Sequence, residues 1–129
     1  MDVLIRYGFS IEEIKNMMDI NQDIDSIPDQ DIYTLIDKLG NVGCMSNHIK
    51  NIFICNPFYL SRNINDVEKL INKLYNIGLS DLYILFDSNP YILNYSDLDI
   101  DNIYNSKVNE GLDNNKILDY FNYELIKNI

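Results

Sequence analysis

The sequence predicts an all-α fold, an α-solenoid of about three helix-loop-helix repeats of about 35 residues, and three observations lead to it. Four of the five glycines, Gly8, Gly43, Gly78 and Gly111, are separated by 35, 35 and 33 residues. Between them, apolar residues recur at intervals of three and four, which is the period of one helix face. No stretch sustains the alternation of apolar and polar residues that a strand shows. A period of this length is typical of helical repeat arrays, whose units bury their apolar faces against one another.

We expect a single helical-repeat domain with four parts. The domain covers residues 1–129, with units at about 8–42, 43–77 and 78–110 and a C-terminal helix over 111–129. Pro57 to Gly78 and Pro90 to Gly111 both span 21 residues. The third interval is therefore shortened between Gly78 and Pro90, and we expect the two missing residues to lie inside one helix.

The residues after each glycine predict where the first helix of each unit begins. A side-chain oxygen at the N-cap accepts a hydrogen bond from a free backbone amide. The expected N-caps are Ser10, Ser46, Ser80 and Asp113. Ser10 with Glu13 also forms a capping box. An aliphatic residue stands six residues after each glycine, at Ile14, Ile49, Ile84 and Ile117.

Proline predicts the end of the first helix in the second and third units, because it has no amide and clashes with the preceding turn. The first unit has Gln22 instead, so we expect a less sharply defined end there. Second helices follow, with stripes at Ile32, Leu35, Ile36 and Leu39, and at Val67, Leu70, Ile71 and Leu74. Gly43 and Gly78 end these helices in the left-handed conformation that costs glycine least. In the third unit we expect the second helix around residues 100–108.

The repeated phrases resemble the repeat of the mitochondrial transcription termination factor (mTERF) family. They read Leu-x-x-x-Gly-Phe/Leu-Ser at residues 4–10 and 74–80, with the variant ending Gly-Cys-Met-Ser at residues 39–46, and Asn-Pro-x-x-Leu beginning at Asn56 and Asn89. The resemblance covers roughly residues 4–125. It implies a left-handed α-solenoid that binds DNA or RNA through a basic concave surface.

The charge of the chain departs from that expectation. Ten basic and twenty acidic residues give a net charge of −10. Divided at the glycines, residues 1–42 carry −6, residues 43–78 carry +2 and residues 79–129 carry −6. Binding to phosphates requires a local excess of Lys and Arg. Only the middle repeat has such an excess, so we expect any nucleic-acid-binding surface to lie there. The candidate nucleic-acid-binding residues are Lys15, Lys50, Arg62, Lys69 and Lys73.

We therefore expect a non-enzymatic interaction module that binds a basic protein through acidic surface, because such a field speeds association with a basic partner. A concrete version is a nucleic-acid-mimicking inhibitor of a basic nucleic-acid-binding protein or nuclease, of the phage anti-defence type. The candidate partner-binding residues are Asp19, Asp23, Asp25, Asp29, Asp31, Asp97, Asp99 and Asp101. An mTERF-like DNA- or RNA-binding protein that uses the middle repeat and a structural subunit of a larger assembly are the alternatives.

No residue pattern predicts catalysis, a cofactor or a metal site. His48 is the single histidine, and Cys55 would lie about 10 Å from it along a helix, too far to share a zinc ion. Cys44 occupies a core position of the repeat. The Asp-rich stretches at residues 19–23 and 97–101 lack the glycine and the bidentate glutamate of an EF-hand loop. We expect no enzyme activity, no cofactor and no bound metal.

The chain also lacks the marks of a membrane or secreted protein. No apolar run approaches the roughly 18 residues of a membrane helix. Asp2 stands where a signal peptide would be basic, and two unpaired cysteines suit a reducing compartment. We expect a cytoplasmic protein that does not associate with membranes.

Overall fold

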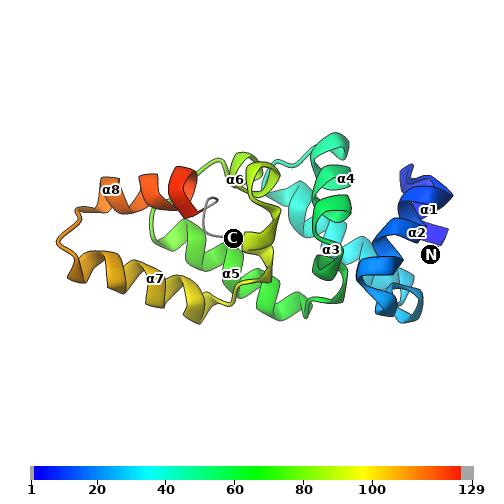
Figure 1. Ribbon diagram of the computed structural model, residues 1–129, viewed down its shortest axis with the longest axis horizontal. Helices are drawn as coiled ribbons and strands as arrows, with labels where there is room; N and C mark the ends of the chain where they lie inside the picture. The colour runs from blue at the N-terminus through cyan, green and yellow to red at the C-terminus, as the bar shows by residue number, and fades with distance from the viewer. Residues whose placement is uncertain (1, 126–129) are drawn as a thin grey trace.

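A computed structural model describes residues 2–125, and every regular element in this range is a helix (Figure 1). The chain opens with α1 (Asp2–Tyr7). Three segments with the same element order follow, each an α-helix, a 3-10 helix and a second α-helix. The first segment is α2 (Ile11–Ile20), η1 (Gln22–Ser26) and α3 (Asp29–Asn41). The second is α4 (Ser46–Cys55), η2 (Pro57–Ser61) and α5 (Ile64–Asn76). The third is α6 (Leu82–Ser88), η3 (Pro90–Asn94) and α7 (Asp97–Asn109). The all-α prediction is confirmed over the described residues.

The chain finishes differently from the predicted continuous helix. Here α8 (Asn114–Asp119) passes into a π-helical turn, η4 (Tyr120–Glu124). The expected helix over 111–129 is thus shorter and changes its winding, and residues 126–129 lie outside the described range. In the third segment, α7 begins three residues earlier than residue 100, because Ser96 caps it: the Asp99 amide donates to Ser96 Oγ at 3.1 Å.

Equivalent helices of successive segments pack against one another along the long axis of the molecule. The helices α2, α4 and α6 form one row, α3, α5 and α7 a second, and the three 3-10 helices a third (Figure 1). No helix within residues 2–125 is both long and apolar enough to cross a bilayer.

Gly43 and Gly78 follow the ends of the second helices α3 and α5 as predicted, and Gly8 and Gly111 follow α1 and α7 in the same way. In chain order, their φ angles are +113°, +104°, +110° and +88°, the left-handed region that favours glycine. After each glycine, the next amide donates to a carbonyl five residues earlier, as in a Schellman motif. These bonds are Phe9 to Leu4, Cys44 to Leu39, Leu79 to Leu74 and Leu112 to Lys107, at 3.0 to 3.2 Å. A β-carbon at Gly43 would also lie 3.1 Å from the Tyr83 ring, so this ring would have to shift by a few tenths of an ångström to admit a larger residue.

The predicted capping box at the start of α2 is present. The Ser10 amide donates to Glu13 Oε1 at 2.8 Å, and this bond holds the pKa of Glu13 below its usual value. In the second segment the expected N-cap Ser46 is wrong by one residue. The cap is Met45, whose amide donates to His48 Nδ1 at 2.9 Å. His48 therefore replaces the carboxylate of Glu13 as the acceptor at the helix start.

The start of α6 contradicts the sequence prediction. Ser80 is not the N-cap; that position belongs to Asp81, which adopts a left-handed φ of 53° and makes no side-chain cap bond. Ile84 is 54% exposed, whereas Leu82 is fully buried in the position held by Ile49. The two missing residues therefore lie before the helix and not inside its stripe, and α6 has seven residues where α4 has ten.

The first helix of the first segment ends as sharply as the others, contrary to expectation. The α2 helix ends at Ile20, one residue before Asn21, just as α4 ends one residue before Asn56. Proline at the next position is thus dispensable, and the shared feature is the asparagine. Asn21, Asn56 and Asn89 are all buried.

Two of these asparagines bind the 3-10 helix of the following segment. Asn21 Nδ2 donates to the Pro57 carbonyl at 3.1 Å and to Ser61 Oγ at 2.8 Å. In the next segment, Asn56 Nδ2 donates to the Pro90 carbonyl and to Asn94 Oδ1, both at 3.0 Å. Because a buried amide needs partners, these bonds fix how each segment sits on the next.

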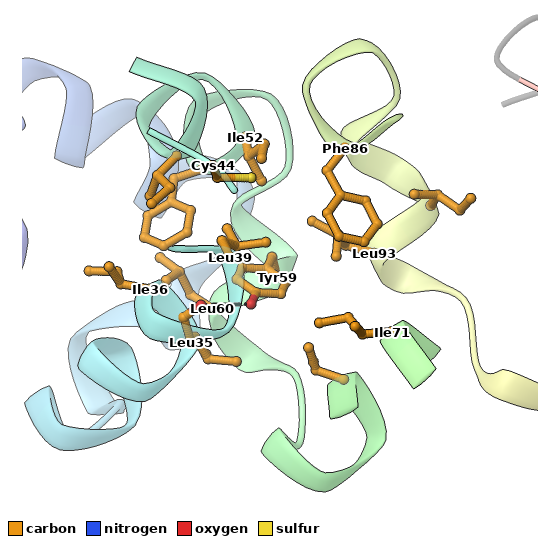
Figure 2. Packing of buried hydrophobic residues seen from close by; sticks show 14 of the residues in the cluster. Leu35, Ile36, Leu39, Cys44, Ile52, Tyr59, Leu60, Ile71, Phe86 and Leu93 are labelled. Atoms are coloured by element: carbon orange, nitrogen blue, oxygen red, sulfur yellow. Dashed lines mark hydrogen bonds between the residues drawn. The ribbon is translucent and has the colours of Figure 1, made fainter. Parts of the chain in front are cut away.

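The core between the first and second segments is continuous, and Figure 2 shows Tyr59 reaching from η2 towards Leu35 of α3. The Tyr59 hydroxyl donates to the Leu35 carbonyl at 2.8 Å. Tyr59 has no exposed surface, and burial raises the pKa of its phenol well above the usual value. Cys44 lies in the same core (Figure 2), as its repeat position predicted.

Candidate protein-interaction surface

The basic side chain of Lys50 faces the preceding segment. Its Nζ donates to the Gly8 carbonyl at 3.0 Å and lies 3.9 Å from Glu13 Oε1. The same ammonium sits 5.5 Å from the centre of the Phe9 ring. Lys50 thus satisfies a carbonyl at the glycine turn and links α4 to the first segment.

Two more lysines pair with acidic residues on the next second helix. Lys38 on α3 lies 3.4 Å from Glu68 on α5, and Lys73 on α5 lies 3.0 Å from Asp101 on α7. Lys38 and Lys73 are 35 residues apart and Glu68 and Asp101 are 33 apart. Opposite charges recurring at the repeat period are the sequence signal that could have identified these pairs.

Arg62 also contacts the following segment. Its Nη2 donates to the Tyr95 carbonyl of the third segment at 2.9 Å. Its Nε is buried and has no hydrogen-bond partner among the described residues.

Three of the five candidate nucleic-acid-binding residues therefore hold neighbouring segments together. Lys15 and Lys69 differ, since both are exposed and neither forms an ion pair within residues 2–125. Most of these basic side chains therefore make contacts between segments and do not form a continuous basic face.

The candidate acidic residues gather around the 3-10 helices and the starts of the second helices. Asp19 lies in the last turn of α2, Asp23 and Asp25 lie in η1, Asp29 and Asp31 in the first turn of α3, and Asp97, Asp99 and Asp101 in α7. Two of them are already paired: Asp29 lies 3.8 Å from Arg6, and Asp101 pairs with Lys73. The other six form no ion pair with any residue of the described chain.

One exposed carboxylate recurs in all three segments. Asp31, Asp66 and Asp99 are each the third residue of a second helix. The 3-10 helices stack on one another and lead into these helices, so the helix starts share one edge of the molecule. We name this edge, with its exposed or half-buried carboxylates, the acidic edge. It consists of Asp23, Asp25, Asp31, Asp66, Asp97 and Asp99.

Sequence reasoning missed Asp66, because the middle repeat carries a net positive charge. The structure shows why the count misleads: Lys50, Arg62 and Lys73 point to neighbouring segments while Asp66 is exposed. An acidic residue in a first helical turn also complements the helix dipole, and Asp99 accepts from the Ser96 amide at 2.9 Å. The carboxylates of the edge thus contribute to helix stability as well as to the surface field.

An open cleft of about 530 Å³ lies on the acidic edge where the first segment meets the second. Asp31 lines one side and Arg62 and Asn63 the other. The cleft is a recess that a partner's side chain can enter.

The cysteines and the histidine do not converge. Among residues 2–125 no three His, Cys, Asp or Glu side chains are grouped so as to hold a metal ion. Cys44 is buried, and desolvation, with a smaller effect of Asp87, raises the pKa of its thiol to about 11. Cys55 is exposed.

No family model, curated protein or solved structure matches this chain. The resemblance to the mTERF repeat therefore stays a prediction.

Proposed function

We propose that the chain is a short α-solenoid that serves as a non-enzymatic interaction module, and that it binds a basic protein through the acidic edge. The solenoid is supported by the element order that recurs three times and by the hydrogen bonds that recur at each glycine and at two of the buried asparagines. Each segment buries its apolar residues against its neighbours, as the units of a repeat array do.

The observation that carries the proposal is that most of the candidate basic side chains face neighbouring segments while the carboxylates of the acidic edge face outwards. Lys38, Lys50 and Lys73 lie against neighbouring segments, whereas the carboxylates of the acidic edge have no ion-pair partner among the described residues. Exposed charges of one sign raise the rate of association with a partner of the opposite sign. A net charge of −10 adds to this field.

The nucleic-acid-mimicking version of this function needs carboxylates in a row. Asp31, Asp66 and Asp99 supply one per segment, at the helix-to-helix separation of about 8–10 Å. The flanking Asp23, Asp25 and Asp97 add charge at both ends of that row. A basic channel that accepts nucleic acid is the partner surface that such a row fits.

The test compares two triple variants of equal charge change. Asp23→Lys, Asp25→Lys and Asp31→Lys alter the edge, and Glu12→Lys, Asp37→Lys and Asp119→Lys alter exposed carboxylates outside it. Each protein is used to capture partners from the native host at salt concentrations of about 50 to 300 mM, a range over which screening strengthens. We expect the wild type and the control variant to retain basic proteins that the edge variant does not retain. Mass spectrometry quantifies the proteins recovered with each. Equal recovery by all three proteins would contradict the proposal.

An mTERF-like nucleic-acid-binding protein is the second candidate, and the exposure of Lys15 and Lys69 favours it. Fluorescence anisotropy with single-stranded DNA, duplex DNA and RNA at about 50 mM salt tests it, since electrostatic binding is strongest at low salt. Binding that Lys15→Glu and Lys69→Glu abolish would support this candidate. The acidic-edge proposal predicts no binding to any of the three.

A further inference from the structure

An exposed aromatic side chain recurs on the 3-10 helices. Phe58 and Tyr91 are the second residues of η2 and η3 and are 49% and 45% exposed. Because η2 and η3 pack against each other, equivalent positions on them face the same side. Ile54, one turn before Phe58, is 39% exposed and extends the apolar surface.

The first segment carries carboxylates at the same two repeat positions. Asp23 is the second residue of η1 and corresponds to Phe58, and Asp19 corresponds to Ile54. Both carboxylates are exposed. The surface along the three 3-10 helices thus changes from acidic at η1 to aromatic at η2 and η3. We name these five residues the aromatic strip: Asp19, Asp23, Ile54, Phe58 and Tyr91.

Buried hydrogen bonds hold the strip together. Asn21 follows the exposed Ile20 and donates to the carbonyl of Pro57, the residue before Phe58. Asn56 makes the equivalent bond to Pro90, the residue before Tyr91. The backbone beneath each aromatic ring is therefore fixed, and little conformational freedom is lost when a partner covers the ring.

Resting on the acidic-edge proposal, we propose that the aromatic strip binds an extended segment of the basic partner. A Lys or Arg of that segment lies at Asp19 and Asp23, and apolar side chains lie on Phe58 and Tyr91. Neighbouring helices are about 8–10 Å apart and an extended chain advances about 3.3 Å per residue. One contact residue in about every three therefore matches the strip.

Charge decides against the other occupants. A nucleic acid could stack its bases on Phe58 and Tyr91 only if its phosphates came close to Asp19 and Asp23. These carboxylates repel phosphates. A second copy of this chain also carries −10, and like charges oppose its approach at the acidic end. A segment that is basic at one end and apolar at the other complements both halves of the strip.

The test uses a fluorescent synthetic peptide of about ten residues. It has two arginines, a leucine and a phenylalanine at intervals of about three residues, made in both chain directions. Anisotropy measures its binding to the intact chain, and a peptide with glutamates in place of the arginines is the charge control. We expect Phe58→Ser and Tyr91→Ser each to weaken binding about fivefold to tenfold, and Asp19→Lys with Asp23→Lys to weaken it by a factor that shrinks with added salt.

Matched controls are Ile11→Ser and Tyr75→Ser, which remove exposed apolar side chains, 72% and 44% exposed, outside the strip. They should leave binding unchanged, and circular dichroism confirms that all variants are folded. Absence of peptide binding in either direction, or equal losses from the control variants, would overturn the proposal. So would tighter binding of a single-stranded oligonucleotide, or a wild-type dimer in sedimentation that the Phe58 and Tyr91 variants convert to a monomer.

Failure of this inference is distinguishable from failure of the proposed function. If the acidic-edge variant loses the host partner while Phe58→Ser with Tyr91→Ser keeps it, the strip proposal fails and the acidic edge stands. If neither set of variants affects the host partner, both fail.

Discussion

A buried asparagine stands at the same repeat position in all three segments, but its hydrogen bonds differ between the first two segments and the third. Asn21 and Asn56 each donate two hydrogen bonds to the following segment. Asn89 occupies the same position and is 2% exposed, yet its Nδ2 finds no hydrogen-bond partner among the described residues.

The difference lies in the next segment of the chain. Asn21 and Asn56 meet a 3-10 helix whose first carbonyl, that of Pro57 or Pro90, faces them. After α8 the chain does not break into a 3-10 helix but continues through the π-helical turn η4, where the Leu125 amide bonds the Tyr120 carbonyl. A repeated residue therefore acts as a connector only where the next segment supplies the matching acceptor.

The largest expected effect concerns the protection of the buried cysteine. Cys44 is buried in the core and Cys55 is exposed, so a thiol reagent at pH 8 should modify Cys44 at least about a hundredfold more slowly than Cys55. Peptide mapping after timed labelling measures both rates. Comparable rates would show that the core around Cys44 opens readily.

The same thiol predicts a pH dependence. Because burial raises the pKa of Cys44 from 9.0 to about 11, the folded chain holds this proton more tightly than the unfolded chain. Its effect on stability is absent below about pH 9, and stability falls as the pH rises from about 9 to about 11. Urea midpoints across this range measure the fall, and Cys44→Ala, which has no thiol, should show a smaller one.

Removing a partnered asparagine should destabilise the fold more than removing the buried hydroxyl of Tyr59. Asn56→Ala deletes the bonds that this buried amide makes to Pro90 and Asn94, at a cost of about 3 kcal/mol. The free energy of unfolding in urea measures it. A loss below about 1 kcal/mol would mean that water replaces the amide.

A smaller loss is expected where the two contacts differ. Tyr59 donates to the Leu35 carbonyl across the first contact, whereas Ile92 holds the equivalent position in the third segment and cannot. Tyr59→Phe should therefore destabilise the chain by about 1 to 1.5 kcal/mol, measured as for Asn56→Ala. An unchanged midpoint would remove this distinction between the two contacts.

The smallest effect is expected at Asn89, whose amide nitrogen has no hydrogen-bond partner within residues 2–125. Asn89→Ala should change the free energy of unfolding by no more than about 0.5 kcal/mol, because no Nδ2 hydrogen bond within the described chain is lost. A loss equal to that of Asn56→Ala would show that the amide of Asn89 has a partner, and the comparison would fail.

The sequence predicted the parts of this fold that depend on local chemistry. A glycine with positive φ and a proline that breaks a helix can each be recognised from a few consecutive residues. The helix ends at Gly43 and Gly78 were predicted from such short stretches. What depends on a neighbour in another segment, about 30 residues away in the sequence, was missed. The pairing of Lys73 with Asp101, the bonds of Asn56 and the exposure of Asp66 all require knowing which segment faces which.

The start of α6 failed for a related reason. Counting six residues from Gly78 selects Ile84, because the count assumes that the two missing residues lie further along, inside the helix. Packing instead preserves the order of Leu82, Leu85 and Phe86, which repeats Ile49, Ile52 and Phe53, and moves the loss into the turn. For the candidate surface, the acidic residues of the first and third segments were predicted, but their unpaired and paired members could not be separated without the structure.

The left-handed Asp81 shows where the chain tolerates a change of length. Two residues fewer than in the other segments are accommodated between Gly78 and Leu82, and the buried stripe downstream keeps its phase. That turn should therefore tolerate short insertions or deletions. They would change the local surface but would leave the packing of the helices that follow it unchanged. An engineer who wants to place a peptide tag or a fluorescent label within this molecule would choose the same few positions.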